Sequence, residues 1–408
     1  MKNIGIVGSG IGGLHLALFL QQHGVAVTLY SDRTAEQLRT SKFYNTPARF
    51  GQTMDRERSV GINHWDDATP LTHFNLAITG TPLQFRAYVE ESGMFIDPRI
   101  YTSTWLDDFE TRGGTVVIGA LTADDVVRLS EQHDLMVIAS GKGSLIELFE
   151  RLPQYSPFDA PQRLLIAGYF DGINKPDQQG MGFVISPGNG EVFQASVNTF
   201  DGVRESLLIE GIPGGGFDIA TKIRYQDNPA EFNAQVLELL RVHAPSVYEL
   251  VDPATFGVAN DEVMQGAVTP TVRKGYKALS NGKFAVAMGD VHVSNDPIVG
   301  QGANNASTAA WTLGDLILNE TSYDETFCAN AEAKMWAYTE SVTNWSNAFL
   351  MPPPDHVLNL LGAASQNQAL ANAFANNFNY PVRQWEVLSS PDNTMAFIQQ
   401  HMTATQPV

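Results

Sequence analysis

Two glycine-rich segments near opposite ends of the chain constrain its fold more than any other feature of the sequence. The first follows a short apolar stretch at residues 2–7 and reads Gly8-Ser9-Gly10-Ile11-Gly12-Gly13. The second starts at Gly289-Asp290 and continues, a few residues later, through residues 297–304. Each segment lies between a strand-like run and a helix-like run, so we expect both to form turns in which the backbone approaches a ligand closely.

The first segment fits the G-x-G-x-x-G pattern of dinucleotide-binding folds. Gly8 permits the tight turn, Gly10 lets the backbone approach a pyrophosphate, and Gly13 allows the helix to pack closely on the strand. The helix expected over residues 12–22 directs its N-terminal N–H groups at the phosphates. This strand–turn–helix context predicts a Rossmann-like unit that binds a dinucleotide.

A second predicted strand, residues 25–30, ends at Ser31-Asp32-Arg33. Asp32 lies where an acidic residue accepts a hydrogen bond from a ribose hydroxyl in such units. Two interpretations of Arg33 stay open: it holds the 2′-phosphate of NADP, or it is a solvated surface charge. This half of the pattern alone therefore does not choose between dinucleotides.

The second glycine-rich segment decides between them. An apolar strand expected over residues 283–287 ends at Gly289-Asp290, and a helix is expected over residues 303–318. Asp290 can accept a hydrogen bond from a ribityl hydroxyl. Gly300 and Gly302 bring backbone N–H groups and the positive end of the helix to a flavin ring edge. A nicotinamide dehydrogenase does not need this second element, so the sequence predicts FAD.

Composition and charge narrow the class of protein. The chain has 408 residues, 43% of them hydrophobic, which suffices for two domains or one large composite core. Its net charge of −19 disfavours nucleic acid as a partner, because the phosphates would be repelled. No apolar run approaches the roughly 18 residues of a membrane-spanning helix, and Met1-Lys2-Asn3 leads directly into the first strand without a signal peptide. The single cysteine, Cys328, excludes an internal disulfide and fits a cytoplasmic location.

The predicted fold class is α/β, with a Rossmann-like FAD-binding domain interleaved with an antiparallel β-sheet substrate domain and a helical C-terminal region. We expect a discontinuous FAD-binding domain at residues 1–160 and 276–320, the substrate-binding sheet at 161–275, and helices at 321–408. Short runs separated by glycine and proline predict the strands of that sheet, at 163–170, 182–186, 192–198 and 205–210, with a helix at 228–242. Residues 41–85 look less regular and are expected to contribute to the substrate pocket.

Several segments of the chain together resemble a known family. The chain is similar to the FAD-dependent oxygenase component of two-component styrene and indole monooxygenases, the group E flavoprotein monooxygenases, within the wider p-hydroxybenzoate hydroxylase-like fold. The matching segments, which are spread over nearly the whole chain, are Gly5–His15, Asn45-Thr46, Asp97–Tyr101, Leu129–Lys142, Gly289–Asn304 and Asn377–Trp385.

The resemblance adds Arg99, which opens a predicted helix and either contacts the cofactor or forms a helix-start salt bridge. With it, the predicted FAD-contacting residues are Gly8, Ser9, Gly10, Ile11, Gly12, Gly13, Ser31, Asp32, Arg33, Arg99, Ser140, Gly141, Gly289, Asp290, Pro297, Gly300, Gln301, Gly302, Ala303 and Asn304.

The resemblance also implies that a partner NADH-dependent flavin reductase supplies FAD in reduced form. Single-component hydroxylases end the strand equivalent to residues 134–138 in an Asp-Gly pair that helps to handle NAD(P)H, whereas this chain has Ser140-Gly141. No second G-x-G-x-x-G offers a separate nicotinamide site. The implied chemistry is addition of O2 to the flavin, followed by oxygen transfer from the C4a-hydroperoxyflavin to an alkene or an electron-rich ring. The alternatives are a self-reducing hydroxylase and a flavin-binding protein without oxygenase activity.

Such chemistry needs a dry apolar pocket and no essential acid–base residue or metal. Asn45, which matches an active-site asparagine of styrene monooxygenases, and Pro297 are expected to position the reactants, although Asn45 could instead cap a turn. The apolar candidates could equally be plain core. The predicted pocket residues are Asn45, Pro47, Arg49, Phe74, Ile78, Phe183, Ile185, Phe193, Val197, Ile298 and Val299.

The substrate stays open between styrene and indole. Arg49 stands where styrene-type members tend to have a histidine, whereas indole-type members tend to have a serine in place of Asn45. A small apolar aromatic molecule is expected, with sulfides as a side activity. The sequence is equally compatible with a monomer and a homodimer.

Overall fold

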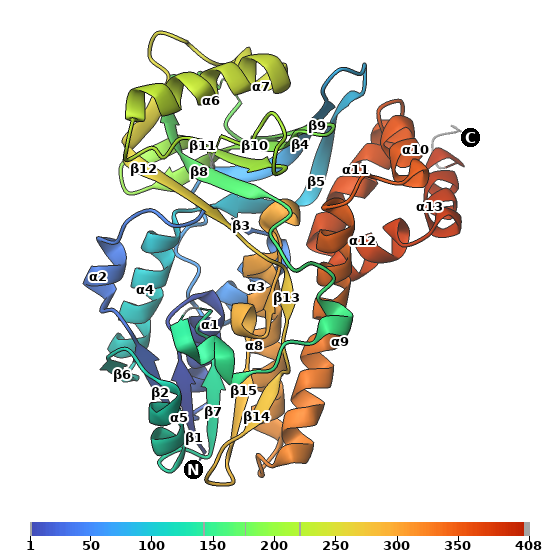
Figure 1. Cartoon of the computed structure of the whole chain (residues 1–408). Coiled ribbons are helices and arrows are strands. Elements are labelled where there is room, and N and C mark those ends of the chain that lie inside the picture. Colours follow the sequence, from blue (N-terminus) through green and yellow to red (C-terminus); the bar gives the residue numbers. More distant parts are fainter. Residues whose placement is uncertain (1, 142, 176, 220–221, 404–408) are drawn as a thin grey trace.

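The structure is a computed structural model that describes residues 2–141, 143–175, 177–219 and 222–403. Lys142, which ends one of the segments that carry the resemblance, and residues 404–408 of the predicted helical region lie outside the described residues, as do residues 1, 176 and 220–221. In Figure 1 two sheets lie one above the other, and helices from the C-terminal part of the chain run along one side of both.

Sheet A, the lower one in Figure 1, is the Rossmann-like sheet. Within the described residues it has six strands in the order β14-β15-β7-β1-β2-β6, and all neighbours are parallel except β14 and β15. The central strands are continuous apolar runs, as expected for a parallel sheet covered on both faces. Their bounds are Asn3–Val7 (β1), Ala26–Ser31 (β2), Thr115–Ile118 (β6), Leu135–Ile138 (β7), Tyr276–Ala278 (β14) and Phe284–Ala287 (β15).

Successive side chains of these strands point to opposite faces, and each face has its own core. Ile4 and Val137 pack against α1 (Ile11–Gln22), α4 (Pro98–Thr111) and α8 (Gly302–Asn319). Met136 and Ile138 pack against α5 (Ala123–Ser130) on the other face. A short helix, α2 (Ala35–Arg39), follows β2 and contacts α4.

Sheet B, the upper one in Figure 1, has eight strands among the described residues, in the order β12-β8-β11-β10-β9-β4-β5-β3. Its neighbours are antiparallel except β4 and β9, which are parallel. The strands are Ala48–Arg49 (β3), Pro70–Ile78 (β4), Gln84–Phe95 (β5), Leu164–Asp171 (β8), Gly180–Ser186 (β9), Gly190–Thr199 (β10), Gly202–Gly211 (β11) and Gly257–Ala267 (β12).

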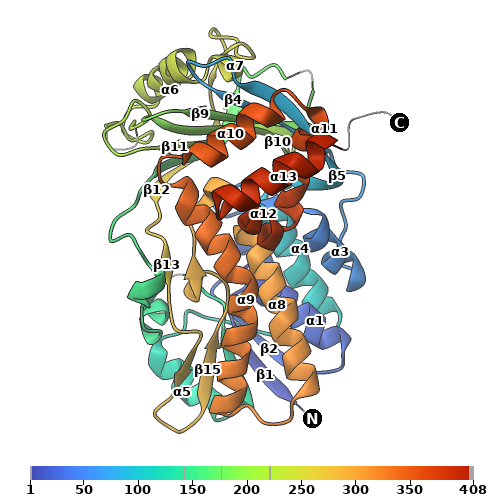
Figure 2. The same cartoon turned by 90° about the vertical axis from the view of Figure 1, so that its right-hand side faces the viewer.

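The two faces of sheet B pack against different partners. The outer face packs against α6 (Pro229–His243) and α7 (Pro245–Tyr248), above the sheet in Figure 1. The inner face packs against the C-terminal helices, which Figure 2 shows in front of the sheet. These helices are α9 (Glu325–Phe349), α10 (Asp355–Ala364), α11 (Gln368–Asn376), α12 (Pro381–Leu388) and α13 (Pro391–Thr403). The predicted α/β fold class with a helical C-terminal region is therefore confirmed.

Short elements complete the chain near the junction of the two sheets. They are α3 (Gly51–Ser59), the strand pair β13 (Thr271–Val272) and β16 (Val293–Ser294), and the 3-10 turns η1 (Gly143–Leu148), η2 (Pro153–Tyr155), η3 (Gly289–Val291), η4 (Pro297–Val299) and η5 (Asn377–Asn379). No helix in the described ranges is both long and apolar enough to cross a membrane.

Residues 41–85, expected to be less regular, contain more secondary structure than expected, although residues 42–47 and 60–69 lie outside helices and strands. This segment contains β3, α3 and β4, and β4 and β5 form a hairpin within sheet B. Buried and less buried residues nearly alternate along β4, which is the pattern of a strand that packs one face on a core. Pro70 at its start and the turn Gly80-Thr81-Pro82 masked this pattern in the sequence.

The packing of α1 on β1 leads to a stability prediction. A Cβ atom at Gly13 would lie 1.9 Å from the carbonyl oxygen of Gly8, whereas a Cβ atom at Gly10 would meet no described atom within 4 Å. We expect Gly13→Ala to lower the free energy of unfolding by about 1–3 kcal/mol, and Gly10→Ala to change it by less than about 0.5 kcal/mol. Urea unfolding of the cofactor-free chain measures both, and equal stabilities of the two variants would contradict the prediction.

Candidate cofactor and substrate site

The loops that follow the parallel strands of sheet A meet at one edge, because parallel strands end at the same edge. Ser9 and Ser31 hydrogen-bond through their hydroxyl groups at 2.7 Å, which joins the loops after β1 and β2. A Cβ atom at Gly8 would lie 2.8 Å from the carbonyl carbon of Ala139, after β7. One at Gly141 would lie 2.6 Å from the Cβ of Asp290, after β15. The structure thus brings the two glycine-rich segments together.

The helices α1 and α8 start beside this edge with their first N–H groups uncapped by side chains. Neither Gly10 nor Gln301, the N-cap residues, makes a side-chain capping bond with the described residues. A Cβ atom at Gly10 or at Gly302 would meet no described atom within 4 Å. Gly12 packs near Met288 and Ala306, so the two helix starts are held in one arrangement. Two open helix N-termini at one edge fit a ligand that has a pyrophosphate and a second polar end, as FAD has.

Residues 31–33 place polar side chains at this edge of sheet A. The Ser31 hydroxyl is buried and donates to the carbonyl oxygen of Arg33 at 2.6 Å. The Asp32 side chain is 63% exposed, and its carboxylate lies 3.4 Å from Nε of Arg33. Asp32 is therefore accessible to a ribose, while Arg33 lies beside it as a partly exposed charge.

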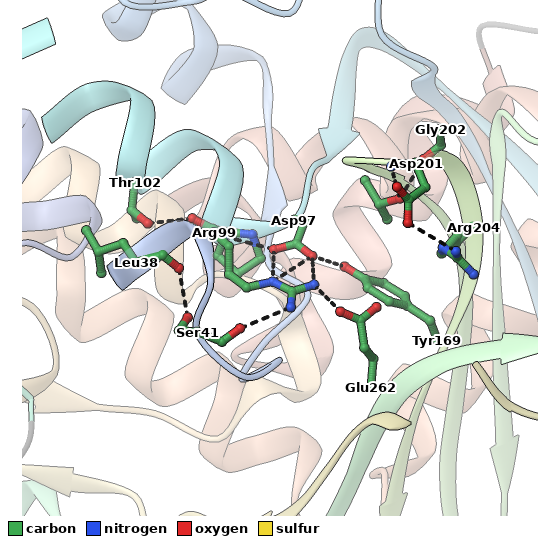
Figure 3. A network of polar contacts seen from close by, with 12 residues as sticks. Leu38, Ser41, Asp97, Arg99, Thr102, Tyr169, Asp201, Gly202, Arg204 and Glu262 are labelled. Atoms are coloured by element: carbon green, nitrogen blue, oxygen red, sulfur yellow. Dashed lines mark hydrogen bonds and ion pairs between the residues drawn. The ribbon is translucent and has the colours of Figure 1, made fainter. Parts of the chain in front are cut away.

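Arg99 lies in a charge network at the start of α4 (Figure 3). Its guanidinium donates to Asp97 through Nε and Nη2, pairs with Glu262 of β12 at 2.6 Å, and donates to the carbonyl oxygen of Ser41 at 3.2 Å. Tyr169 of β8 donates to the same Asp97 carboxylate at 2.9 Å, and burial raises the pKa of Tyr169. The guanidinium therefore forms the helix-start salt bridge and links α4 to sheet B.

Gln301 and Asn304 use their amides to tie the start of α8 to other parts of the chain. Gln301 donates to the carbonyl oxygen of Phe378 at 2.9 Å. The Asn304 oxygen accepts from Phe50 N–H and Thr53 Oγ1, and its nitrogen donates to the carbonyl oxygens of Ala48 and Gly300. The Asn304 side chain is thus an anchor for the cofactor-side helix, and the sequence did not indicate these partners.

The predicted pocket residues Asn45, Pro47 and Arg49 do not share one environment. Asn45 is exposed and its Oδ1 accepts from the N–H of the next residue, Thr46, at 2.8 Å, and Pro47 is half-buried. Arg49 is fully buried, pairs with Glu57 at 2.6 Å, and its guanidinium carbon lies 5.1 Å from the ring centroid of Trp65. The Arg49 side chain therefore lies in a buried cluster with residues of α3 and α4, apart from the other pocket candidates.

His15 of α1 completes this buried cluster. Its Nε2 lies 3.7 Å from Glu57, and its ring lies 4.6 Å from that of Trp105. Burial, helped by the positive charge of Arg49, lowers the pKa of His15 to about 3, and burial raises the pKa of Glu57. His15 is thus a neutral, fully packed core residue. The sequence analysis missed Glu57, since its pairing depends on the fold.

The apolar pocket candidates do lie together on the inner face of sheet B. They belong to, or pack against, a single apolar cluster, and the rings of Phe183 and Phe193 stack at 4.5 Å. Pro297 is half-buried and begins the η4 turn, which carries two members of the cluster. The candidates in this cluster are Phe74, Ile78, Phe183, Ile185, Phe193, Val197, Ile298 and Val299.

The opposite wall of the cluster comes from helices that the sequence analysis did not connect to the site. Phe378 of η5 lies 4.9 Å from the ring of Phe74 and 4.9 Å from that of Trp345 in α9. Phe378 is also the residue whose carbonyl accepts from Gln301 at the start of α8. The resemblance at residues 377–385 pointed to this segment, but only the fold places it against Phe74. In the described part of the chain, no group of three or more His, Cys, Asp or Glu residues is arranged to hold a metal.

Comparison with solved structures defines the class of fold. The flavin-dependent brominase Bmp2 superimposes with a TM-score of 0.71 at 12% identity, over 98% of this chain and 100% of that chain. Aklavinone-11 hydroxylase, solved with FAD and aklavinone, gives a TM-score of 0.58 at 16% identity, over 85% of this chain and 68% of that chain. The fold is that of flavin-dependent monooxygenases.

Sequence comparison then gives the family. A family model of the styrene monooxygenase A substrate-binding domain matches residues 141–249. The styrene monooxygenase StyA of Pseudomonas fluorescens is 37% identical over 98% of both chains, and that of a further Pseudomonas species is 37% identical over 96% of both. The chain belongs to the styrene monooxygenase StyA family. It is an FAD-dependent monooxygenase, as the resemblance implied.

The anchoring role of Asn304 can be tested by stability. Asn304→Ala leaves the buried N–H of Phe50 and the buried carbonyl of Ala48 without their partner. Each such group costs about 1–3 kcal/mol, so we expect a loss of at least about 2 kcal/mol in the free energy of unfolding. The control is Asn319→Ala at the other end of α8, where the exposed amide makes only a local bond to Asp315. Equal, small effects of both substitutions would show that the Asn304 bonds do not anchor α8.

Proposed function

We propose that this chain is the oxygenase of a two-component system that oxidises a small apolar aromatic substrate, either a styrene-like alkene or indole. It receives FAD already reduced by a separate NADH-dependent flavin reductase. One observation supports this proposal above the others: the η4 turn, which leads into the open N-terminus of α8, belongs to the same apolar cluster as the inner face of sheet B. Cofactor edge and apolar pocket are then neighbours.

In this proposal the described residues hold the cofactor at its two ends. The N–H groups at the start of α1 bind the pyrophosphate, and Asp32 and Asp290 accept from ribose and ribityl hydroxyls. The start of α8, from Gly300 to Ala303, directs its positive end at the flavin ring. The bound, reduced FAD supplies the reaction with O2 and the activated oxygen atom.

The chain contributes orientation and exclusion of water. The apolar cluster gives the substrate a dry surface, which prevents side reactions with water. Asn45 and Pro297 position substrate and cofactor at the entrance and at the η4 turn, respectively. No side chain is assigned the role of an essential acid or base.

Two features favour the two-component arrangement over a self-reducing hydroxylase. The turn after β7 reads Ser140-Gly141 and packs against Asp290, so it belongs to the cofactor edge. The relatives over the full chain are named styrene monooxygenase StyA, and among the described strands only β1 is followed by a G-x-G-x-x-G turn. We further propose a cytoplasmic protein, monomeric or homodimeric. The lone Cys328 is buried, and burial raises its pKa to about 12, so it is an unreactive packing residue.

The central experiment is aerobic turnover of styrene and of indole by the purified chain with FAD and NADH, with and without an unrelated FAD reductase. We expect styrene oxide or an indole oxidation product only when the reductase is present. The matched control is Gly10→Val, whose larger side chain enters the space reserved for the pyrophosphate while the helix N-cap conformation remains allowed. Product without the reductase would favour the self-reducing hydroxylase. Absence of oxygenated product despite bound, reduced FAD would reject both substrates as proposed.

Asn45 provides a second test. Because Asn45 is exposed and its side chain makes only a local bond to Thr46, Asn45→Ala should leave the free energy of unfolding within about 0.5 kcal/mol. We expect turnover or the enantiomeric ratio of the epoxide to change several-fold. Chiral product analysis beside thermal unfolding measures both. A change in stability alone would assign Asn45 to turn capping.

A further inference from the structure

A cluster of buried charged groups lies at one end of the inner face of sheet B, next to the η4 turn. Glu210 of β11 shares this face with Leu208, whereas the neighbouring Leu207 and Ile209 point to the outer face. The Glu210 side chain is fully buried, and Asp296, the N-cap residue of η4, is only 2% exposed. The other charged groups that act on this pair are Glu191 of β10 and Arg163, just before β8.

Arg163, the arginine of the cluster, forms its ion pair with Glu191. Its Nε lies 2.7 Å from Glu191 Oε2 and its Nη2 lies 3.0 Å from Oε1, a bidentate ion pair. Its remaining nitrogen, Nη1, donates to the carbonyl oxygens of Gln162 and Leu350. None of these Arg163 hydrogen bonds goes to Glu210 or Asp296, and the free oxygens of the pair receive no bond from it.

Three oxygen atoms of the Glu210–Asp296 pair have no donor among the described residues. They are both carboxyl oxygens of Glu210 and Oδ2 of Asp296, whereas Oδ1 of Asp296 accepts from Ile298 N–H at 3.2 Å. The two carboxyl groups lie within hydrogen-bond reach of each other. Two ionised carboxylates in contact and out of water would repel strongly, while one proton between them supplies the missing hydrogen bond.

We propose that Glu210 and Asp296 share one proton at neutral pH, and that Glu210 is thereby a positioning residue for the η4 turn that faces the flavin. The turn depends on Asp296 in two ways. The Asp296 carboxylate caps Ile298 N–H, and Ser346 of α9 donates to the Asp296 carbonyl oxygen. The turn then closes at Gly300, in the left-handed conformation with φ of 64°. The contacts of the turn are given by the structure, and the part of this proposal that rests on the proposed function is that the flavin lies at this turn.

The proposal has a defined pH dependence. Burial raises the pKa of Asp296 to about 6, and burial, together with the nearby Asp296 and Glu191 charges, raises the pKa of Glu210 well above its ordinary value. A carboxyl group whose pKa is higher in the folded state stabilises the fold fully below its unfolded pKa, and this stabilisation is lost as pH rises through the folded pKa. The folded chain should therefore lose stability from the pair as pH rises from about 4 to beyond 6.

The shared proton can be observed directly by infrared spectroscopy of the cofactor-free chain. We expect the difference spectrum between the parent chain and Glu210→Gln at neutral pH to contain the carbonyl band of a protonated carboxylic acid. Gln donates an N–H to Asp296 without a shared proton, so the fall in the midpoint of thermal unfolding with rising pH should be smaller in this variant. Asp296→Asn keeps the cap on Ile298 and gives the same test if the first variant does not fold. A missing acid band, or the same pH dependence in parent and variant, overturns the proposal.

Binding of oxidised FAD, followed by its fluorescence, tests the link to the cofactor. We expect the Kd of the parent chain to rise more than that of Glu210→Gln between pH 6 and 9, with a difference of at most about tenfold per pH unit, which is the limit for one titrating proton. The control is Glu205→Gln on the same strand but the opposite face, where Glu205 accepts from Ser196 at 2.6 Å. It should follow the parent.

The outcomes separate the two proposals. The infrared and unfolding measurements need neither flavin nor substrate, so a missing acid band overturns the shared proton even if styrene is oxidised. An acid band without any difference in FAD binding overturns the positioning role. Failure of styrene and indole turnover with both signals present rejects the proposed substrates alone.

Discussion

The close approach of α1 to β1 is the contact on which the rest of the molecule depends. Without a side chain at Gly13 the helix lies directly over the Gly8 carbonyl, which directs the first N–H groups of α1 over the edge of sheet A. The helix α8 packs directly on α1, since Gly314 packs against Phe19 and Gly12 against Ala306. The position of α8 in turn determines where the η4 turn meets sheet B. The arrangement of the candidate cofactor edge and of the apolar cluster thus depends on one backbone contact.

Sheet B separates two apolar cores, one on each face, that have different roles. Its outer face is sealed by α6 and α7, and the aromatic and aliphatic side chains there only stabilise the sheet. Its inner face is closed by residues from far along the chain, among them Phe378 and Trp345, and η4 enters this core from the cofactor side. Gln301 at the start of α8 also hydrogen-bonds to Phe378, so this bond links the start of α8 to the helical side of the apolar cluster.

Local patterns in the sequence predicted many of the helices and strands. Contacts between residues far apart in the sequence could not be predicted, for a physical reason. Glycine spacing and apolar periodicity act within one element, so β1, α1 and the strands at 164–211 could be predicted. The environment of Arg49 could not, because its ion pair with Glu57 and its aromatic neighbours come from elements that only tertiary packing brings together. The four bonds of Asn304 escaped prediction in the same way.

The ionisable groups in this protein hold structure in place and leave the chemistry to the cofactor. Asp97 at the start of α4 accepts from Tyr169 of β8, Glu57 of α3 pairs with Arg49 of β3, and Asp296 caps Ile298 N–H in η4. The proposed function assigns none of these groups the role of an essential acid or base. The enzyme needs them at fixed places while water is excluded. Changes of pH should therefore act first on how the site is assembled, and only through that on turnover.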